Sequence, residues 1–172
     1  MAPKPRRYRS PQGPRNRVRS PSNAPLSFAS AVGEDCIFCA IVKGEAPASL
    51  THEDDSVIAF MDIQPITHGH MLVVPREHAV LMQDVNETSA MRAFRVARRM
   101  AALARQTLGA SGANLLVMDG EVAFQDVPHF HIHVIPRYPG DGFGLTFPKS
   151  YEEPPSRAEL ETVAAAIRAA GS

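Results

Sequence analysis

The clearest periodic pattern along the chain is helical and spans residues 87–108. Apolar residues recur there at positions 90, 94, 97, 101, 104 and 108, in steps of three and four that place them on one face of a helix. Five arginines in the same span mostly occupy other positions, which favours a solvated outer face over a binding patch. Gly109 suits the left-handed backbone that ends many helices. The pattern predicts a helix that packs its apolar face on a core.

Short β-type runs lie on both sides of this helix. Residues 57–61 and 71–74 are apolar, and a connection with proline and glycine separates them, as in a hairpin. Residues 114–118 and 129–135 form a second pair after the helix. Near the C-terminus, Ser156 and Glu159 have capping-box spacing and predict a helix that extends toward Ala170. Residues 136–155 are expected to form a surface loop.

The order of these elements indicates the fold class. Two strands, a helix, two strands and a helix follow one another, and most connections are too short for crossovers between parallel strands. We therefore expect an α+β fold, with an antiparallel sheet of about five strands, one long helix and a C-terminal helix. At 172 residues, the chain is long enough for one such domain, which we assign to residues 33–172.

The first 32 residues differ in composition from the rest. The net charge of the chain is zero, yet seven of its 18 lysines and arginines lie in the first 20 residues, where no acidic residue occurs. This segment is also rich in proline and poor in large apolar residues, so we expect residues 1–32 to be a disordered basic extension. Three alternatives stay open: contact with nucleic acid or an anionic surface, no specific role, or a misassigned translation start. Nucleic acid is the less favoured partner.

The sequence contains no segment with the length and hydropathy of a membrane span or of a signal peptide. We therefore expect a soluble, cytoplasmic protein without a membrane partner. Its two cysteines, Cys36 and Cys39, are separated by two residues. This spacing is more typical of metal sites and redox pairs than of structural disulfides.

Three of the seven histidines, His129, His131 and His133, alternate with apolar residues. In a β-strand, alternate side chains project to one face and lie about 6.6 Å apart. The apolar set is expected to face the core and the imidazoles to share the other face. Three interpretations are open from the pattern alone: a surface stripe, a metal site, or a site in which one neutral imidazole is a nucleophile.

This segment resembles the signature of the histidine triad (HIT) superfamily, in which three histidines alternate with apolar residues. The stretches CIFCAIVKGEAPA, AFMDIQPITHGHMLVVPREH and FQDVPHFHIHVIPR occur in the order and spacing typical of bacterial HIT hydrolases. The resemblance covers roughly residues 36–144. It implies a HIT-like fold and a homodimer.

The resemblance also implies a catalytic role for His131, His133 and Gln125. His131 would attack the α-phosphorus of an adenosine or other purine nucleotide conjugate and form a nucleotidyl-histidine intermediate, which water hydrolyses to a nucleoside monophosphate. His133 and Gln125 would contact and position the phosphate. The conjugate could be a phosphoramidate, an adenylate or a dinucleoside polyphosphate. A nucleotide-binding regulatory or interaction module with weak turnover is the alternative function.

By the same resemblance, one structural zinc ion per chain is expected on Cys36, Cys39, His78 and His129. Two free buried thiols without a metal are the alternative.

Further residues are expected to bind the nucleotide. The resemblance places four apolar side chains around the base, Asp62 on the ribose hydroxyls, and Asn114, Gln125 and His133 among the remaining contacts. The four apolar residues are Ile37, Phe38, Ile41 and Phe60. His70 is expected to support the triad, and His52 and His68 to lie in surface loops.

Three positions depart from the family pattern. Phe124 replaces the glycine that usually precedes the glutamine, Met118 stands where an amide is common, and Asp126 places an acid where Ser, Thr or Glu is more typical. These departures leave the expected nucleophile intact. They put the substrate preference in doubt, because a bulky phenylalanine narrows the approach of the leaving group and an acid disfavours a long polyphosphate.

Overall fold

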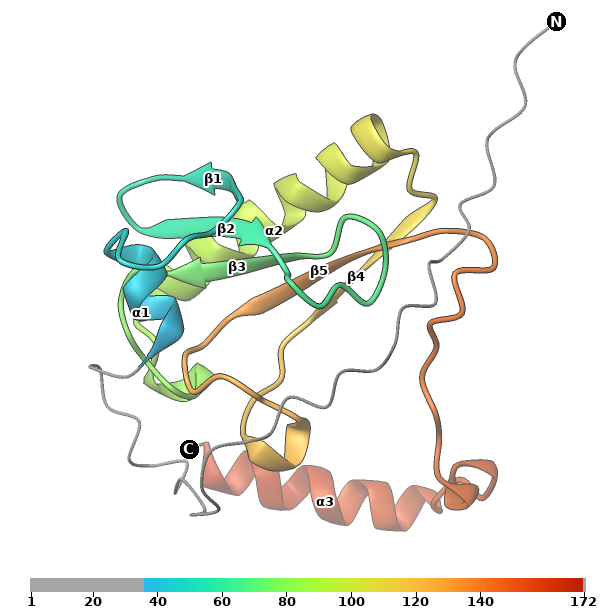
Figure 1. Cartoon of the computed structure of the whole chain (residues 1–172). Coiled ribbons are helices and arrows are strands. Elements are labelled where there is room, and N and C mark those ends of the chain that lie inside the picture. The colour runs from blue at the N-terminus through green and yellow to red at the C-terminus, as the bar shows by residue number, and fades with distance from the viewer. Residues whose placement is uncertain (1–35, 172) are drawn as a thin grey trace, which may run out of the picture.

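The computed structural model of the chain describes residues 36–171 (Figure 1). The predicted extension at residues 1–32 lies outside the described residues, as do residues 33–35 and Ser172 of the predicted domain. Within residues 36–171, no helix is both long enough and apolar enough to cross a membrane.

A five-stranded antiparallel sheet with the strand order β1-β2-β3-β5-β4 forms the centre of the molecule. This confirms the predicted fold class. The strands are β1 (Leu50–Glu53), β2 (Val57–Met61), β3 (Met71–Pro75), β4 (Gly112–Leu116) and β5 (Ile132–Arg137). No pattern in the sequence predicts β1, because none of its four residues is buried and it carries no apolar alternation.

Two of the three helices in the described part of the chain cover the sheet, one on each face (Figure 1). Buried residues of α2 (Glu87–Leu108) pack against one face together with Phe130, Ile132 and Val134. On the opposite face, residues of the short α1 (Ile37–Val42) pack with the alternate residues of β2 and β3.

The long helix agrees with its prediction at both ends. The side chain of Asn86 caps the start of α2 by accepting a 3.0 Å hydrogen bond from the Thr88 amide. At the other end, Gly109 has a φ of 70°, in the left-handed region that glycine tolerates.

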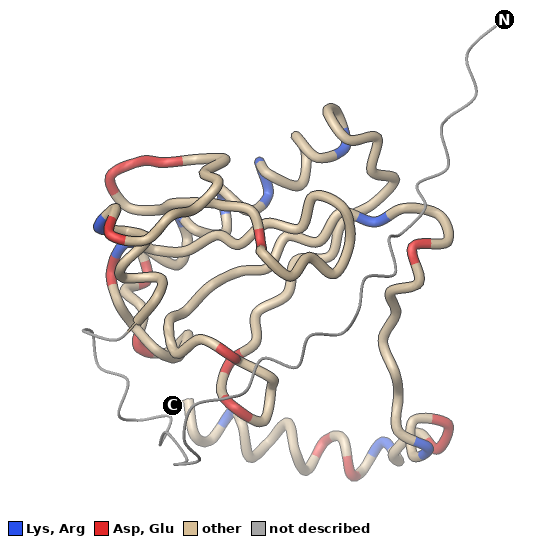
Figure 2. The backbone as a smooth tube through the Cα atoms, in the orientation of Figure 1, with Lys and Arg blue, Asp and Glu red and all other residues tan. Residues whose placement is uncertain are grey.

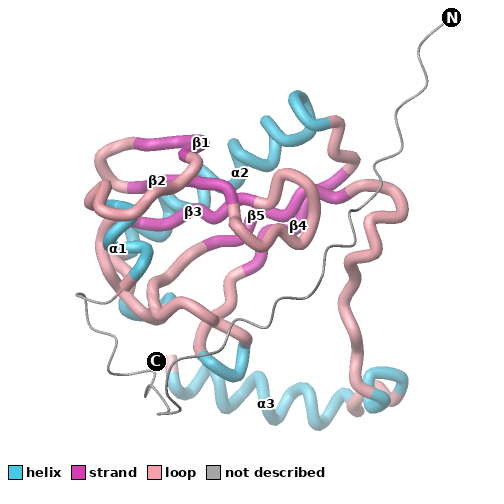
Figure 3. Tube along the Cα trace, viewed as in Figure 1, coloured by secondary structure: helices cyan, strands magenta, loops and turns pink. Residues whose placement is uncertain are grey.

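The C-terminal helix α3 (Arg157–Ala170) lies apart from the sheet, at the end of a long loop that follows β5 (Figures 1 and 3). The predicted capping box between Ser156 and Glu159 is present, and no residue of α3 is buried. Three short 3₁₀ segments complete the described elements: η1 (Met82–Asp84), η2 (Glu121–Ala123) and η3 (Lys149–Glu152).

The histidine segment differs from its prediction in one respect. We expected one strand over residues 129–135, but β5 begins at Ile132, so His129 and His131 precede it and only His133 lies within it. The alternation still holds, because Phe130, Ile132 and Val134 face α2 while the rings of His129 and His131 lie against Phe38 on the α1 side. His129 lies outside the sheet, and its carbonyl oxygen accepts a hydrogen bond from the side chain of His131.

Candidate active site and metal centre

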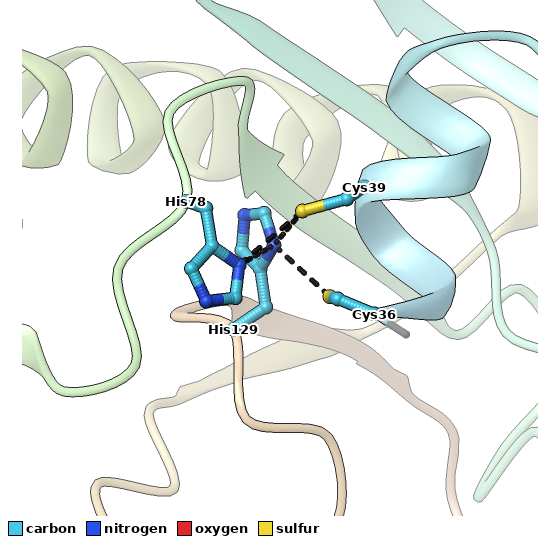
Figure 4. A group of neighbouring side chains, drawn as sticks. All are labelled: Cys36, Cys39, His78 and His129. Atoms are coloured by element: carbon cyan, nitrogen blue, oxygen red, sulfur yellow. Dashed lines mark hydrogen bonds between the residues drawn. The ribbon is translucent and has the colours of Figure 1, made fainter. Parts of the chain in front are cut away.

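Two cysteines and two histidines from three separate segments converge beside the start of β5 (Figure 4). Cys36 precedes α1 and Cys39 lies on it, whereas His78 follows β3 and His129 precedes β5. Their sulfur and nitrogen ligand atoms all lie within 4.8 Å of one another. The structure therefore brings together the four residues that the family resemblance implied as ligands, and we refer to them as the Cys2His2 cluster.

The distances in this cluster match the ligand sphere of a tetrahedral zinc ion. Nδ1 of His129 lies 3.5 Å from Sγ of Cys36, 3.6 Å from Sγ of Cys39 and 3.3 Å from Nδ1 of His78. Sγ of Cys39 lies 3.2 Å from Nδ1 of His78. Zinc bonds of about 2.3 Å to sulfur and about 2.0 Å to nitrogen require sulfur and nitrogen ligands to be about 3.5 Å apart, and two nitrogens about 3.3 Å apart. Both the donor set and its spacing fit zinc.

Protonation also suits a metal ligand at His129. Its Nε2 donates a 2.9 Å hydrogen bond to the carbonyl oxygen of Pro75, so in the neutral ring Nδ1 presents a lone pair to the cluster. Burial lowers the pKa of His129 to about 4, which keeps the ring neutral. Burial also raises the pKa of the Cys39 thiol to about 11, and the neighbouring Cys36 adds to the shift. A divalent cation that binds here displaces thiol protons.

His131 is held in one tautomer by the backbone. Its Nδ1 donates a 2.7 Å hydrogen bond to the carbonyl oxygen of His129. Burial lowers its pKa, and the Asp62 and Asp126 carboxylates oppose this shift. A neutral imidazole with its proton on Nδ1 has a free lone pair on Nε2. His131 can therefore act as a nucleophile near neutral pH without first losing a proton.

A chain of polar contacts runs from His133 to Asp62. Nδ1 of His133 lies 3.1 Å from Nε2 of His70, and Nδ1 of His70 lies 3.2 Å from Oδ2 of Asp62. The amide of Ile66 also points at Nδ1 of His70, at 3.2 Å. A neutral His70 has one proton, so it either donates to Asp62 and accepts from His133, or accepts from Ile66 and donates to His133. His70 thus fixes the orientation of His133, as expected of a supporting histidine.

Both rings in this chain favour the neutral form. Burial lowers the pKa of His133 to about 4, and the nearby His131 and His70 add to the shift. Burial also lowers the pKa of His70, against the opposing effect of Asp62. With His131, three neutral imidazoles therefore lie side by side at neutral pH, and their mutual repulsion is avoided.

A pocket of about 1130 Å³ opens beside these rings. It is lined by six of the eight residues expected to bind substrate and by the expected nucleophile, His131. The six are Ile37, Phe38, Ile41, Phe60, Asp62 and His133.

Two expected contact residues lie elsewhere. Gln125 is buried, and its amide holds the loop before His129: Nε2 donates to the carbonyl oxygens of Val80 and Val127, and Oε1 accepts from the Gly120 amide. These bonds occupy the side chain, which does not line the pocket.

Asn114 lies on β4 and accepts a 2.6 Å hydrogen bond from Arg137, which is also paired with Asp141. It does not line the pocket either. Gln125 thus uses both ends of its amide within the loop, whereas Asn114 uses its oxygen to bind Arg137.

The structure also adds pocket residues that the sequence did not single out. Ala46, Pro47, Ala48 and Ser49 between α1 and β1 line the pocket, as do Ile63, Gln64 and Ile66 after β2. These are loop residues without a periodic pattern or a reactive group, so no signal in one sequence marks them. His52 was expected in a loop but lies in β1, where its Nε2 is 3.0 Å from Asp54, whereas His68 is an exposed loop residue as expected.

Comparison with known proteins agrees with this geometry. Residues 43–140 match the HIT domain. The chain is 36% identical over 135 residues to a protein named "Protein hit" of Bacillus subtilis, covering 78% of this chain and 92% of that protein. It is also 36% identical over 123 residues to an adenosine 5′-monophosphoramidase of Schizosaccharomyces pombe, covering 69% of this chain and 89% of the yeast protein.

One solved structure with a similar fold is a zinc-bound protein. The crystal structure of a zinc-bound histidine triad family protein from Mycobacterium smegmatis aligns with a TM-score of 0.62 and 41% identity, over 69% of this chain and 86% of that chain. The match to the HIT domain covers more than half of the sequence. With the alternating histidines beside a pocket, it establishes that the chain belongs to the HIT family.

Proposed function

We propose that the protein hydrolyses nucleotide conjugates at the α-phosphorus and releases a nucleoside monophosphate, with His131 as nucleophile. The observation that carries this proposal is the hydrogen bond from Nδ1 of His131 to the carbonyl oxygen of His129, which leaves Nε2 unprotonated in a ring that lines the pocket. The similar yeast protein is an adenosine 5′-monophosphoramidase, which supports a purine nucleotide with a nitrogen leaving group.

The proposed reaction has two steps. In the first, Nε2 of His131 forms a bond to the α-phosphorus, the bond from phosphorus to the leaving group breaks, and the leaving atom takes a proton. In the second, water attacks the same phosphorus, the bond to Nε2 breaks, and water gives up a proton. One water molecule is consumed per monophosphate released, and His133 contacts the phosphoryl oxygens in both steps.

The nucleoside is assigned to the wall of the pocket formed by α1 and the end of β2. Ile37, Phe38, Ile41 and Phe60 supply an apolar slot for the base. Asp62 is assigned to the ribose hydroxyls, although its carboxylate also accepts a 2.7 Å hydrogen bond from the Gln64 amide. Gln125 and Asn114 are left out of this assignment, because neither lines the pocket.

The Cys2His2 cluster is proposed to hold one structural zinc ion. Zinc would join the segments before α1, after β3 and before β5, and so hold His129 in place.

A cytoplasmic location and a homodimer are also proposed. The free edge of β4 and the exposed Met91 and Phe94 of α2 are compatible with a second copy, and sedimentation of the purified protein tests this.

Turnover by the purified protein tests the proposed function. Wild type and the His131→Ala variant are incubated with adenosine 5′-phosphoramidate and with a diadenosine polyphosphate, and AMP is measured by chromatography. We expect His131→Ala to lose at least about a thousandfold in kcat/KM while its circular dichroism and Tm stay near wild type. His68→Ala, an exposed histidine outside the pocket, is the matched control.

Release of AMP that survives His131→Ala would contradict the assignment. Tight nucleotide binding without release by the wild type would instead favour a regulatory module.

A further inference from the structure

The second wall of the pocket comes from the loop between β4 and β5, residues 117–131. Met118, Phe124, Asp126 and Val127 of this loop line the pocket. The nucleoside and the leaving group are different substituents of the α-phosphorus, so they occupy different parts of the pocket. With the nucleoside assigned to α1 and β2, the β4–β5 wall is one of the surfaces left for the leaving group.

The charged side chains that line the pocket are negative. Among the described residues that line it, Asp62 and Asp126 are acidic, and none is lysine or arginine. The β4–β5 loop as a whole carries three acidic residues and no lysine or arginine, and Figure 2 shows the acidic positions in red. A leaving group with several negative charges would therefore be repelled at this wall.

Asp126 is the acid that is free to bind a ligand. It is exposed, and it has no hydrogen bond or ion pair to any residue of the described chain. Asp62, in contrast, already contacts Gln64 and His70. Asp126 and the nucleophile His131 line the same pocket. An unpaired carboxylate thus lies beside the reacting centre.

Phe124 adds an aromatic surface to the same wall. Its side chain is 79% exposed, and its φ of 67° is in the left-handed region that phenylalanine rarely adopts. Strained backbone conformations of this kind are common at ligand sites, where a functional requirement outweighs their conformational cost. An exposed aromatic face beside a carboxylate attracts cations, and the Met118 thioether adds a flexible apolar contact.

We propose that Met118, Phe124 and Asp126 form a leaving-group subsite for a positively charged amine on a short apolar chain. Asp126 pairs with the ammonium group, and Phe124 and Met118 cover the chain. This inference rests on the proposed hydrolysis at His131 and narrows its substrates to nucleoside phosphoramidates of basic amines, at the expense of dinucleoside polyphosphates. The bond that breaks is P–N, the amine leaves with a proton, and water supplies the oxygen of the monophosphate.

The experiment uses three adenosine 5′-phosphoramidates with N-linked butyl chains that end in an ammonium, a methyl or a carboxylate group, together with the unsubstituted phosphoramidate. For the wild type we expect kcat/KM to be at least about tenfold higher with the ammonium than with the carboxylate, which corresponds to about 1.4 kcal/mol. Asp126→Asn should reduce this ratio to within about threefold, and Asp126→Glu should restore it. Glu121→Gln removes a charge from the same loop but not from the pocket, and should retain the wild-type ratio.

The possible failures are distinguishable. Turnover that depends on His131 but shows no preference for the ammonium, or a preference that persists in Asp126→Asn, overturns the subsite. Hydrolysis of the unsubstituted phosphoramidate alone overturns it as well. Absence of AMP release from all four compounds, or release that persists in His131→Ala, contradicts the proposed function itself.

Discussion

His129 joins the Cys2His2 cluster to His131 through two different groups of one residue. Its imidazole lies within 3.6 Å of both cysteine sulfurs, and its carbonyl oxygen accepts the 2.7 Å hydrogen bond from Nδ1 of His131. The position of the carbonyl therefore depends on how firmly the ring is held. No residue of the Cys2His2 cluster lines the pocket. A substitution in the cluster should nevertheless change the position of His131 and so its reactivity.

Replacement of a cluster cysteine tests this coupling. We expect Cys36→Ser to lose zinc, to lower the Tm, and to reduce kcat by about tenfold or more, because the carbonyl that fixes the His131 tautomer becomes mobile. Zinc content is measured by metal analysis of the purified protein, and Tm by circular dichroism. His68→Ala controls for loss of a surface side chain. A Cys36→Ser variant that keeps full zinc content would contradict the assignment of the cluster, and one that loses zinc but keeps its kcat would contradict the coupling.

A second prediction concerns the turn between β1 and β2. Asp54 accepts hydrogen bonds from the amides of Ser56 and Val57 at 2.8 and 2.9 Å, and its Oδ2 lies 3.0 Å from Nε2 of His52. The Ser56 amide is the largest cause that lowers the pKa of Asp54 from 3.8 to about 2, and His52 and the Val57 amide add to the shift. Because the pKa is lower in the folded than in the unfolded protein, the stabilisation is complete above about pH 4 and is lost as the pH falls toward 2.

Urea unfolding between pH 7 and pH 3 measures this effect. We expect Asp54→Ala to lower the free energy of unfolding by about 1 kcal/mol at pH 7, and the difference from wild type to shrink below pH 4. Asp54→Asn keeps an acceptor that does not titrate, so its advantage over Asp54→Ala should not change with pH. A wild-type advantage over Asp54→Ala that is constant down to pH 3 would show that the carboxylate is not the source.

The sequence predicted the features that repeat or that carry reactive groups. The helical spacing of apolar residues placed α2, and the capping box placed the start of α3. The alternation of histidine and apolar residues identified which side of the histidine segment faces the core. The four cluster residues came from a family resemblance, since Cys36 and His129 are 93 residues apart and no local pattern links them.

Hydrogen bonds formed in the folded protein account for two differences between the predictions and the structure. The family resemblance implied a phosphate contact for Gln125, but only the folded loop shows that the backbone of Val80, Gly120 and Val127 occupies its amide. Likewise, the strand expected from residue 129 begins three residues later, because Phe130 donates its amide to Ala79 outside the sheet ladder.

Phe124 occupies a position where the backbone conformation favours glycine. Its φ of 67° is imposed by a loop in which the amide of Phe124 bonds to Glu121 and the side chain of Gln125 is anchored by three hydrogen bonds. A left-handed conformation costs a residue with a Cβ about 1–2 kcal/mol, and glycine avoids this cost but loses more entropy on folding. Phe124→Gly should therefore exceed Phe124→Ala in free energy of unfolding by about 0.5–1 kcal/mol. Both variants lack the ring, so urea unfolding of the two at equal zinc content isolates the backbone effect, and equal stabilities would mean that residue 124 is not strained.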